Sequence, residues 1–348
     1  MSVDGARLLE YLTAALDGAR VGLAEPPAPV SGGFDTRIYT LRLVGAPPAL
    51  SGPLILRVLA PHHDPRRALR EQAIQNALAD QGYPAPRALL ASGDRGILGA
   101  GFLIMERRPG RTLLEQRRLG MAGVVVRAQR RLHALDPEPV MAALEAAVPG
   151  AVKDHTVEGL IGLLEERIVR GRLLGLVPAL GWLRANRPAE ERAPVVCHGD
   201  FHPQNILVDE RREVTGVLDW PNVLFAPPAC DIAASRVILR YTPIDVTSLP
   251  RHLRWLVRAA RLALVRRFMT GHRRGREPLD RWALCHYEAL ACMRGLVRVA
   301  ESRAAAARGG APLNRLDASS FGERLAARFV RLTGVRPSLP PITHPESS

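Results

Sequence analysis

The chain has 348 residues, 47% of them hydrophobic, which is enough for one large folded domain or two of typical size. Its net charge of +14 comes almost entirely from arginine, because Lys153 is the only lysine. No apolar run reaches the roughly 18 residues that a transmembrane helix needs, so no membrane span is expected. The first residues lack a basic-then-apolar secretory pattern, and we therefore expect a cytoplasmic protein.

The positive charge is not accompanied by a nucleic-acid signature. No basic patch is interleaved with aromatic residues, and no helix-turn-helix or RNA-binding motif is present. We therefore expect no nucleic-acid partner. The four cysteines are scattered without a CxxC pair, which predicts reduced, mostly buried thiols and no cysteine metal site: Cys197, Cys230, Cys285 and Cys292.

The N-terminal part of the chain is predicted to combine two helices with short strands. Apolar residues at helical spacing predict an amphipathic helix over 4–16, and a second helix is expected over 65–80. Short runs rich in β-branched and apolar residues predict four strands, over 38–43, 54–59, 88–91 and 102–106. The segment 107–111 contains Pro and Gly and breaks this pattern, which predicts a hinge between two lobes.

Beyond the hinge the pattern changes to long helices. Apolar residues recur at three- and four-residue spacing over 113–135, 156–173, 250–270 and 279–306. A short strand at 193–197 and a hairpin of 206–208 with 215–218 are expected between them. The sequence thus predicts an α+β fold with a small N-terminal β-sheet lobe with helices and a larger, mainly helical C-terminal lobe. The proline-rich tail 336–348 is expected to be disordered.

The most informative motif is the octapeptide at 198–205, His-Gly-Asp-Phe-His-Pro-Gln-Asn, which is followed by Asp-Trp at 219–220. It places Asp200, then Asn205 five residues later, then Asp219 after a further fourteen. Phosphoryl transfer needs a base for the acceptor hydroxyl and oxygen ligands for Mg²⁺, and this spacing supplies both. The predicted hairpin brings Asn205 and Asp219 to neighbouring positions, so that both can reach one cation.

The segment from His198 to Asp231 resembles the aminoglycoside phosphotransferase and choline kinase-like family, which has a protein-kinase-like fold. That family shows His-Gly-Asp, then Asn, then Asp-Trp or Asp-Phe, and then an Asp that opens a helix, here Asp231. The resemblance extends over roughly 20–335. It implies a nucleotide-binding lobe at 1–108 and a catalytic and acceptor-binding lobe at 109–335, with the active site in the cleft between them.

The resemblance also implies a reaction and roles for the motif residues. The reaction is the transfer of the γ-phosphoryl group of ATP to a hydroxyl of a small molecule. Asp200 is the expected catalytic base, and Asn205 and Asp219 are the expected Mg²⁺ ligands. His198 and Asp231 are expected to support the catalytic loop.

Nucleotide binding is assigned by the same resemblance. The glycines ahead of the strand at 38–43 resemble the loop that covers the nucleotide, and backbone groups near the hinge are expected to meet the adenine edge. The expected nucleotide-binding residues are Ser31, Gly32, Gly33, Arg57, Glu71, Met105 and Glu106.

Arg57 is a departure from the family pattern, which has a lysine at this position on the strand. Glu71, on the helix that follows, is the expected partner. Arginine is always charged and can bind phosphate oxygens through two parallel hydrogen bonds, so ATP binding remains the expectation. Efficiency and the choice between ATP and GTP stay open.

The acceptor is not identified by the sequence. From residue 221 onward there are 21 arginines and 9 acidic residues, whereas a polycationic aminoglycoside requires an acidic pocket. A neutral or anionic metabolite, or a macrolide-like apolar molecule, agrees better with this charge. Two alternatives remain: a catalytically impaired nucleotide-binding module of the same fold, and a basic interaction protein. The oligomeric state is left open.

Overall fold

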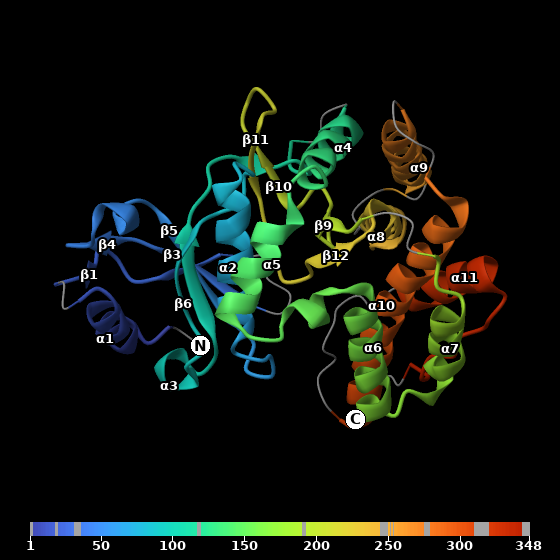
Figure 1. Cartoon of the computed structure of the whole chain (residues 1–348), viewed down its shortest axis with the longest axis horizontal. Helices are drawn as coiled ribbons and strands as arrows, with labels where there is room; N and C mark the ends of the chain where they lie inside the picture. Colours follow the sequence, from blue (N-terminus) through green and yellow to red (C-terminus); the bar gives the residue numbers. More distant parts are fainter. Residues whose placement is uncertain are drawn as a thin grey trace. The chain divides into compact units, whose positions relative to one another are not determined.

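The computed structural model forms two compact units (Figure 1). Unit 1 combines residues 1–116, 136–152 and 204–221, and unit 2 combines 117–135, 153–203 and 222–348. The predicted lobe boundary at 108 stays a prediction, since unit 1 also contains two later segments of the chain. The structure describes residues 3–17, 20–30, 36–116, 120–189, 193–243, 250, 252, 254–274, 279–309 and 320–342.

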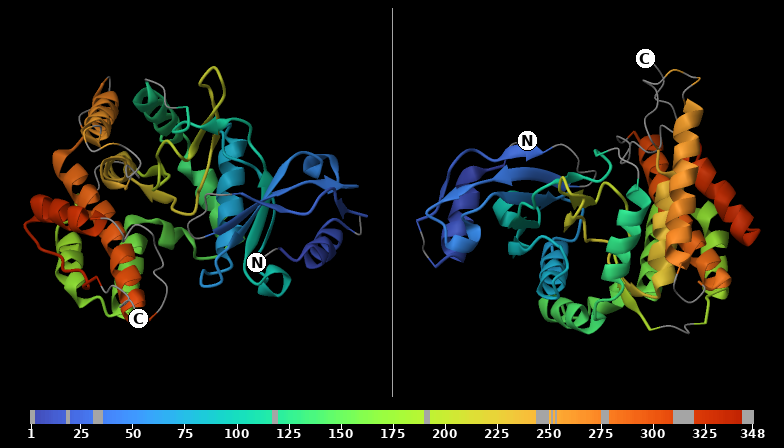
Figure 2. Two further views of the ribbon diagram at one scale, coloured as in Figure 1. Left: turned by 180° about the vertical axis from the view of Figure 1, so that it is seen from behind. Right: turned by 90° about the horizontal axis from the view of Figure 1, so that it is seen from above.

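Unit 1 is built on a five-stranded antiparallel sheet with the order β2-β3-β5-β7-β6 (Figures 1 and 2). Its strands are β2 (Ala28–Val30), β3 (Thr36–Leu41), β5 (Leu54–Leu59), β6 (Ala88–Ser92) and β7 (Phe102–Glu106).

Helix α1 (Gly5–Ala15) covers one face of this sheet. Asp4 caps the helix by accepting hydrogen bonds from the amides of Ala6 and Arg7, at 3.1 and 3.2 Å. Successive side chains of a strand point to opposite faces, and the even-numbered residues of β5 accordingly join α1 in one apolar core. The core contains Leu8 and Leu12 of α1 with Leu54, Leu56, Val58, Phe102 and Ile104 of the sheet.

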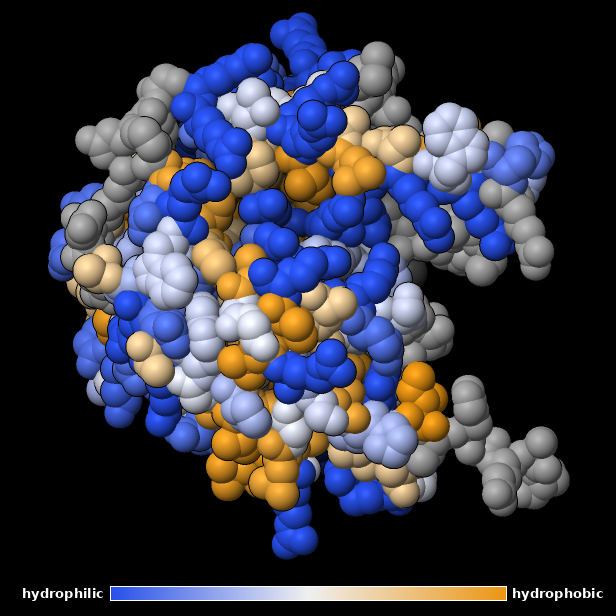
Figure 3. All heavy atoms as spheres, turned by 90° about the vertical axis from the view of Figure 1, so that its right-hand side faces the viewer, coloured by the Kyte–Doolittle hydropathy of each residue, from blue (hydrophilic) through white to orange (hydrophobic). Residues whose placement is uncertain are grey.

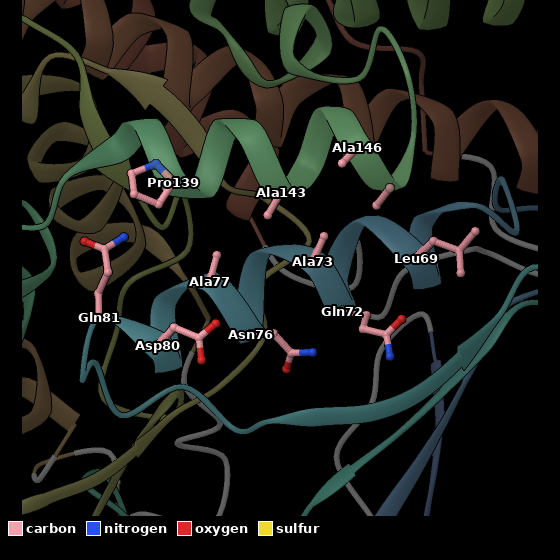
Figure 4. Close-up of a pocket in the computed structure, with 11 residues that line it drawn as sticks. Leu69, Gln72, Ala73, Asn76, Ala77, Asp80, Gln81, Pro139, Ala143 and Ala146 are labelled. Carbon is pink, nitrogen blue, oxygen red and sulfur yellow. The ribbon is translucent and has the colours of Figure 1, made fainter. Parts of the chain in front are cut away.

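Helix α2 (Arg67–Asp80) lies on the opposite face, against β6 and β7. The odd-numbered residue Leu59 of β5 packs here with Ala68 of α2. Because Arg57 lies two residues before Leu59, the strand alternation directs it to the same face. Helix α5 (Pro137–Ala147) packs along α2, and a groove between the two helices is lined largely by small side chains (Figure 4).

Two smaller sheets complete unit 1. A three-stranded sheet has the order β11-β10-β8, and the two-residue strands β1 (Gly22–Leu23) and β4 (Leu43–Val44) form a pair. Strands β10 (Ile206–Val208) and β11 (Val214–Val217) form the predicted hairpin, which contacts β8 (Arg111–Thr112). Short helical segments are η1 (Pro48–Leu50) and α3 (Arg95–Leu98).

Unit 2 is predominantly helical. Helix α10 packs against α6, α7, α8 and α11, while α9 packs against α4 and α8. In Figure 3, which views the right-hand side of Figure 1, hydrophilic and apolar side chains are mixed over the visible face. The helices are α4 (Met121–Leu132), α6 (Val157–Gly171), α7 (Val177–Ala185), α8 (Pro228–Tyr241), α9 (Arg254–Arg273), α10 (Arg281–Ala307) and α11 (Phe321–Thr333), with the short η2 (Val152–His155) and η3 (Leu174–Leu176). A two-stranded sheet pairs β9 (Val195–Cys197) with β12 (Leu224–Ala226).

The structure confirms the α+β class with a small antiparallel-sheet lobe and a larger helical one. The helix predicted over 113–135 is shorter: it begins at Met121, after Gly120 in a left-handed conformation (φ 95°). Helices α5, α7 and α11 were not predicted. Helices α5 and α7 are short and contain proline in their first turn, which weakens their helical pattern, whereas α11 repeats Phe321, Leu325 and Phe329 at four-residue spacing, a helical signal that was present in the sequence.

The C-terminal segment 336–342 contains no helix or strand, but it is hydrogen-bonded. The amide of Ser338 donates to the carbonyl of Gly175 at 2.8 Å, and Arg303 donates to the carbonyl of Pro340 at 3.2 Å. The rest of the tail, for which disorder is expected, lies outside the described residues. None of the described helices is long and apolar enough to cross a membrane.

Candidate active site

The loop of unit 2 that follows strand β9 contains a glycine at a position where any side chain would be strained. Gly199 has φ 73°, and a Cβ atom there would lie 2.2 Å from the carbonyl oxygen of Asn222. The amide of Gly199 donates to Asp231 Oδ1 at 2.8 Å, and its carbonyl accepts from Arg294 Nη1 at 2.9 Å. The backbone of Gly199, directly before Asp200, is thus held by hydrogen bonds at both its amide and its carbonyl.

Asp200 lies in a loop held by its neighbours. Its amide donates to Nδ1 of His198 at 3.3 Å, and the His198 ring meets the ring of Phe201 edge-on at 5.4 Å. Both rings are fully buried, whereas the Asp200 side chain is 29% exposed. Nε2 of His202 lies 3.6 Å from Asp200 Oδ1. The predicted base is therefore a partly exposed carboxylate on a rigid loop, as proton transfer requires.

Asp231 is the centre of a buried hydrogen-bond network on helix α8. Beyond the amide of Gly199, its carboxylate binds Nε2 of Gln129 and Nε2 of His133, both at 2.9 Å. Burial acts to raise the pKa of Asp231, but the hydrogen bond and charge of His133, the charge of His198 and the hydrogen bond of Gln129 outweigh it and lower the pKa to about 2. Asp231 is therefore a structural carboxylate that stays ionised.

The network extends beyond the residues that the sequence indicated. Gln129 Nε2 also contacts the hydroxyl of Ser235 at 3.0 Å, and its Oε1 lies 3.0 Å from Nε2 of His272. Gln129 and His133 are four residues apart at the end of α4, so they share one helix face. The only sequence signal for this role was that Gln129 and His133 are polar residues on an otherwise apolar helix face.

Unit 1 holds the other half of the predicted site, a carboxylate–arginine–carboxylate triad. Arg57 Nη1 donates to Glu71 Oε2 at 2.8 Å, and Arg57 Nη2 donates to Asp219 Oδ1 at 2.7 Å. The side chains of Arg57 and Glu71 are 10% and 1% exposed, whereas that of Asp219 is 38% exposed. Burial acts to lower the pKa of Arg57, but Glu71 and Asp219 outweigh it and raise that pKa. Arg57 therefore stays charged, and it contacts the predicted metal ligand.

Asn205 precedes β10 and Asp219 follows β11, so both lie at the open end of the hairpin. The amide of Leu218 donates to the carbonyl of Asn205 at 2.8 Å, and Asp219 follows directly with φ 69°. Asp219 thus occupies a strained left-handed conformation, which is uncommon for a residue other than glycine. Amide and carboxylate oxygens are the donors that Mg²⁺ prefers, so the two residues fit the implied ion. No cluster of three or more His, Cys, Asp or Glu suited to a metal occurs in the described part of the chain.

The remaining predicted nucleotide residues divide into two groups. Met105 is buried on β7, next to Glu106, whose Oε1 accepts from the amide of Arg87 at 2.9 Å and from Arg108 Nη1 at 3.1 Å. The amide of Glu106 also donates to the carbonyl of Arg87, so this end of β7 is well fixed. The predicted phosphate-covering residues Ser31, Gly32 and Gly33 lie outside the described residues.

The structure thus groups the predicted residues within each unit. Arg57, Glu71 and Asp219 meet in unit 1, although Arg57 and Asp219 are separated by 162 positions. His198 and Asp231 support the Asp200 loop in unit 2, together with residues that the sequence did not reveal. Within unit 1, the arrangement can hold a cation near a charged arginine, and within unit 2 it presents a carboxylate for proton transfer.

Comparison with known proteins identifies the family that the chain matches. Residues 28–277 match the model of the phosphotransferase enzyme family (APH). The chain is 33% identical over 159 residues to an aminoglycoside 3'-phosphotransferase of Streptomyces fradiae, a match that covers 44% of the chain and 57% of the relative. Acyl-CoA dehydrogenase family members also match, and the chain spans 16% to 57% of the length of these first relatives.

Solved structures with the same fold cover most of the chain. An aminoglycoside 3'-phosphotransferase of type VIII has a TM-score of 0.54 at 24% identity, over 82% of this chain and 97% of that one. The aminoglycoside phosphotransferase of Streptomyces rimosus, in complex with ADP and streptomycin, has a TM-score of 0.50 at 22% identity, over 83% and 97%. At these identities the likeness shows the fold alone.

Proposed function

Since this chain belongs to the phosphotransferase enzyme family, we propose that it transfers the γ-phosphoryl group of ATP to a hydroxyl group of a small molecule. One observation carries the proposal: Arg57, Glu71 and Asp219 meet within hydrogen-bond distance, although they come from a strand, a helix and a hairpin. A charged arginine beside a half-exposed carboxylate suits the phosphates and the divalent ion of a nucleotide.

Asp200 is the proposed base. Its partly exposed carboxylate would accept the proton of the acceptor hydroxyl as that oxygen attacks the γ-phosphorus. The rigidity of the loop supports this role, because Gly199 is held at both its amide and its carbonyl. His198 and Asp231 would act as positioning residues that keep the carboxylate aimed at the hydroxyl.

Asn205 and Asp219 are the proposed ligands of Mg²⁺. Bound there, the ion would neutralise the phosphate oxygens on which charge develops during transfer. The contact between Asp219 Oδ1 and Arg57 restrains the carboxylate, and the 38% exposure of the Asp219 side chain leaves it accessible.

Arg57 is the proposed phosphate-binding cation. A guanidinium group has five N–H donors, and two of them account for the hydrogen bonds to Glu71 and Asp219. Each terminal nitrogen therefore retains a second hydrogen that can be donated to a phosphate oxygen. Catalysis in this scheme rests on positioning and electrostatics, as is usual for phosphoryl transfer.

The second candidate is a nucleotide-binding module with impaired turnover. The ion pair between Arg57 and Asp219 favours it, because the predicted metal ligand already has a cationic partner. Such a module would bind Mg-ATP and release little ADP with any acceptor. We prefer an active kinase to an impaired module because Asp200, Asn205 and Asp219 are all present in the family order.

Two measurements test the proposal. Thermal unfolding of the full chain should show stabilisation by ATP that depends on Mg²⁺, because binding to the folded state raises its stability. Screening hydroxylated metabolites for ADP release should then identify acceptors, with Asp200→Ala as the inactive control. If Mg-ATP leaves the melting temperature unchanged and no acceptor stimulates ADP release, the proposed function is wrong.

A further inference from the structure

Helix α9 of unit 2, which packs against α4 and α8 (Figure 1), is held in one orientation by contacts on its inner face. Arg261 donates to the carbonyls of Arg240 and Thr242 at the C-terminal end of α8, at 3.3 and 2.5 Å. Nε2 of His272 lies 3.0 Å from Oε1 of Gln129 in α4. Three apolar side chains of this face are buried: Val265, Phe268 and Met269. These contacts determine which residues of α9 point outward.

The outer face of α9 changes in character along the helix. Between residues 254 and 263 seven residues are exposed, and six of them are apolar: Trp255, Leu256, Ala259, Ala260, Leu262 and Ala263. Between residues 266 and 274 five residues are exposed, and four of them are arginines: Arg266, Arg267, Arg273 and Arg274. The outer face of α9 thus has an apolar half followed by a basic half.

The two halves share one side of the helix. Trp255, Leu262, Arg266 and Arg273 follow one another at spacings of seven, four and seven residues, which places them along one line of an α-helix. The apolar members are well exposed, since the exposed fraction is 61% for Trp255 and 42% for Leu262. A flat partner can therefore contact the apolar and the basic half at the same time.

An ordinary solvated helix face has a different composition. Such faces commonly carry acids and bases four residues apart, which pair with one another. Helix α9 contains no acidic residue in its 20 positions. Arg266, Arg267 and Arg273 form no ion pair with an acid in the described part of the chain. Their positive charges are therefore available to an external partner, beside apolar side chains that the fold leaves in solvent.

We propose that the outer face of α9 docks on a membrane surface that contains anionic lipids. Helices that lie in the plane of such a surface place Trp and Leu at the boundary between head groups and acyl chains, while arginines contact the lipid phosphates. The basic half is complementary in charge to this surface. Exposed Trp255, Leu256 and Leu262 favour lipid over a nucleic-acid duplex, because arginines alone suffice to contact duplex phosphates.

Binding of the full chain to vesicles tests this inference. Sedimentation compares vesicles of phosphatidylcholine alone with vesicles of equal parts phosphatidylcholine and phosphatidylglycerol. We expect binding to the mixed vesicles only, and weaker binding as the salt concentration rises, because salt screens the attraction. The fluorescence of Trp255 should shift to shorter wavelength as its ring enters the lipid boundary. Trp255→Phe, which keeps an apolar ring, should lose this shift and still bind.

Variants assign vesicle binding to the two halves of the face. Arg266→Gln and Arg267→Gln should each weaken binding by about 5-fold, the effect of one charge near an anionic surface. Trp255→Ser should weaken it by roughly 10-fold, because a large apolar side chain is lost. The controls are Arg170→Gln, in an exposed ion pair of α6, and Leu174→Ser, at a residue of η3 that is 75% exposed. Both controls should bind as the wild type does.

The outcomes are decisive for the membrane surface and leave the proposed phosphotransfer to its own tests. Equal binding to both kinds of vesicle would overturn the role of anionic lipids, and absence of vesicle binding would overturn the proposal. Binding of a DNA duplex that depends on Arg266 and Arg267, without vesicle binding, would assign the basic half to nucleic acid instead. Undiminished vesicle binding by the double variant of Trp255→Ser and Arg266→Gln would exclude α9 as the docking face. Melting temperature and Mg-ATP stabilisation should stay at wild-type values in every variant, because the substituted side chains are exposed and lie outside the proposed active site.

Discussion

Asp219 in unit 1 and Asp231 in unit 2 are both carboxylates that follow the His-Gly-Asp motif, yet their surroundings differ. Asp219 is 38% exposed and has an ion pair with Arg57. Asp231 is 1% exposed, and its oxygens accept from the amide of Gly199 and from the side chains of Gln129 and His133. The first carboxylate keeps access to solvent, and the second has its hydrogen bonds satisfied inside the fold.

This difference indicates how a carboxylate that binds a metal ion can be distinguished from one that supports the fold. A carboxylate that is to bind an ion must exchange partners, and a charged, partly exposed pair allows this. A buried carboxylate with three donors cannot lose any of them cheaply, because an unsatisfied buried polar group costs about 1–3 kcal/mol. We therefore expect changes at Asp219 to affect nucleotide binding and changes at Asp231 to affect folding.

The largest expected effect is on turnover and concerns the loop that Asp231 supports. Asp200→Ala should lower the turnover number by about 10²–10⁴-fold, because the acceptor hydroxyl loses its base. Affinity for Mg-ATP should change little, since the proposed nucleotide-binding residues belong to unit 1. Steady-state ADP release and ATP titration measure the two quantities. Near-wild-type turnover would exclude Asp200 as the base.

Replacing the buried carboxylate should mainly cost stability. Asp231→Ala leaves His133, Gln129 and the amide of Gly199 without their shared acceptor, and we expect a loss of about 3–5 kcal/mol in the free energy of unfolding. Urea unfolding followed by circular dichroism measures it. A loss below about 1 kcal/mol, within the range of ordinary surface substitutions and single hydrogen bonds, would contradict the supporting role.

Replacing Asp219, the more exposed carboxylate, should impair ligand binding more than it impairs stability. Asp219→Ala should abolish the Mg²⁺-dependent stabilisation by ATP, because the amide of Asn205 cannot hold a divalent ion alone. Stability without ligand should change less than in Asp231→Ala. The matched control is Glu210→Ala, an exposed acid in the same hairpin. An unchanged Mg-ATP shift in Asp219→Ala would remove the metal assignment.

Arg57 links Glu71 and Asp219 in unit 1. Replacing it should selectively weaken the binding of ligands that carry phosphate groups. Arg57→Ala should weaken ATP binding by about 10- to 150-fold, equivalent to roughly 1.5–3 kcal/mol, and leave adenosine binding nearly intact. Arg57→Lys should restore part of the affinity, and Arg42→Ala, at an exposed position after β3, serves as the control. Equal losses for ATP and adenosine would assign Arg57 a structural role.

The smallest expected effect is the pH dependence of the stability that Asp231 provides. Its pKa is lowered from 3.8 to about 2 in the folded protein, so the folded state favours the ionised form. The resulting stability, about 2 kcal/mol, is fully present above pH 4 and is lost as the pH falls through 2. The difference in unfolding free energy between wild type and Asp231→Asn should therefore shrink between pH 4 and pH 2. A difference that is independent of pH in this range would contradict the lowered pKa.

Local patterns in the sequence predicted a large part of this protein. The spacing of Asp200, Asn205 and Asp219 requires only a loop and a hairpin, both of which are short-range structures. Arg57 and its partner Glu71 were assigned by the family resemblance, and the alternation along residues 54–59 explains why Arg57 lies on the face of the sheet that α2 covers. Such features depend on neighbours a few residues apart, and periodicity therefore reveals them.

Other features were decided by the tertiary structure alone. Gln129 and His133 reach Asp231 across 102 and 98 positions, and Arg294 reaches Gly199 across 95. Nothing local distinguishes these residues from other polar residues on helices, because their partners are brought to them only when the helices pack. The sequence by itself determined the fold class and the motif residues, whereas helix packing selected the residues that hold the motif and the arginine beside it.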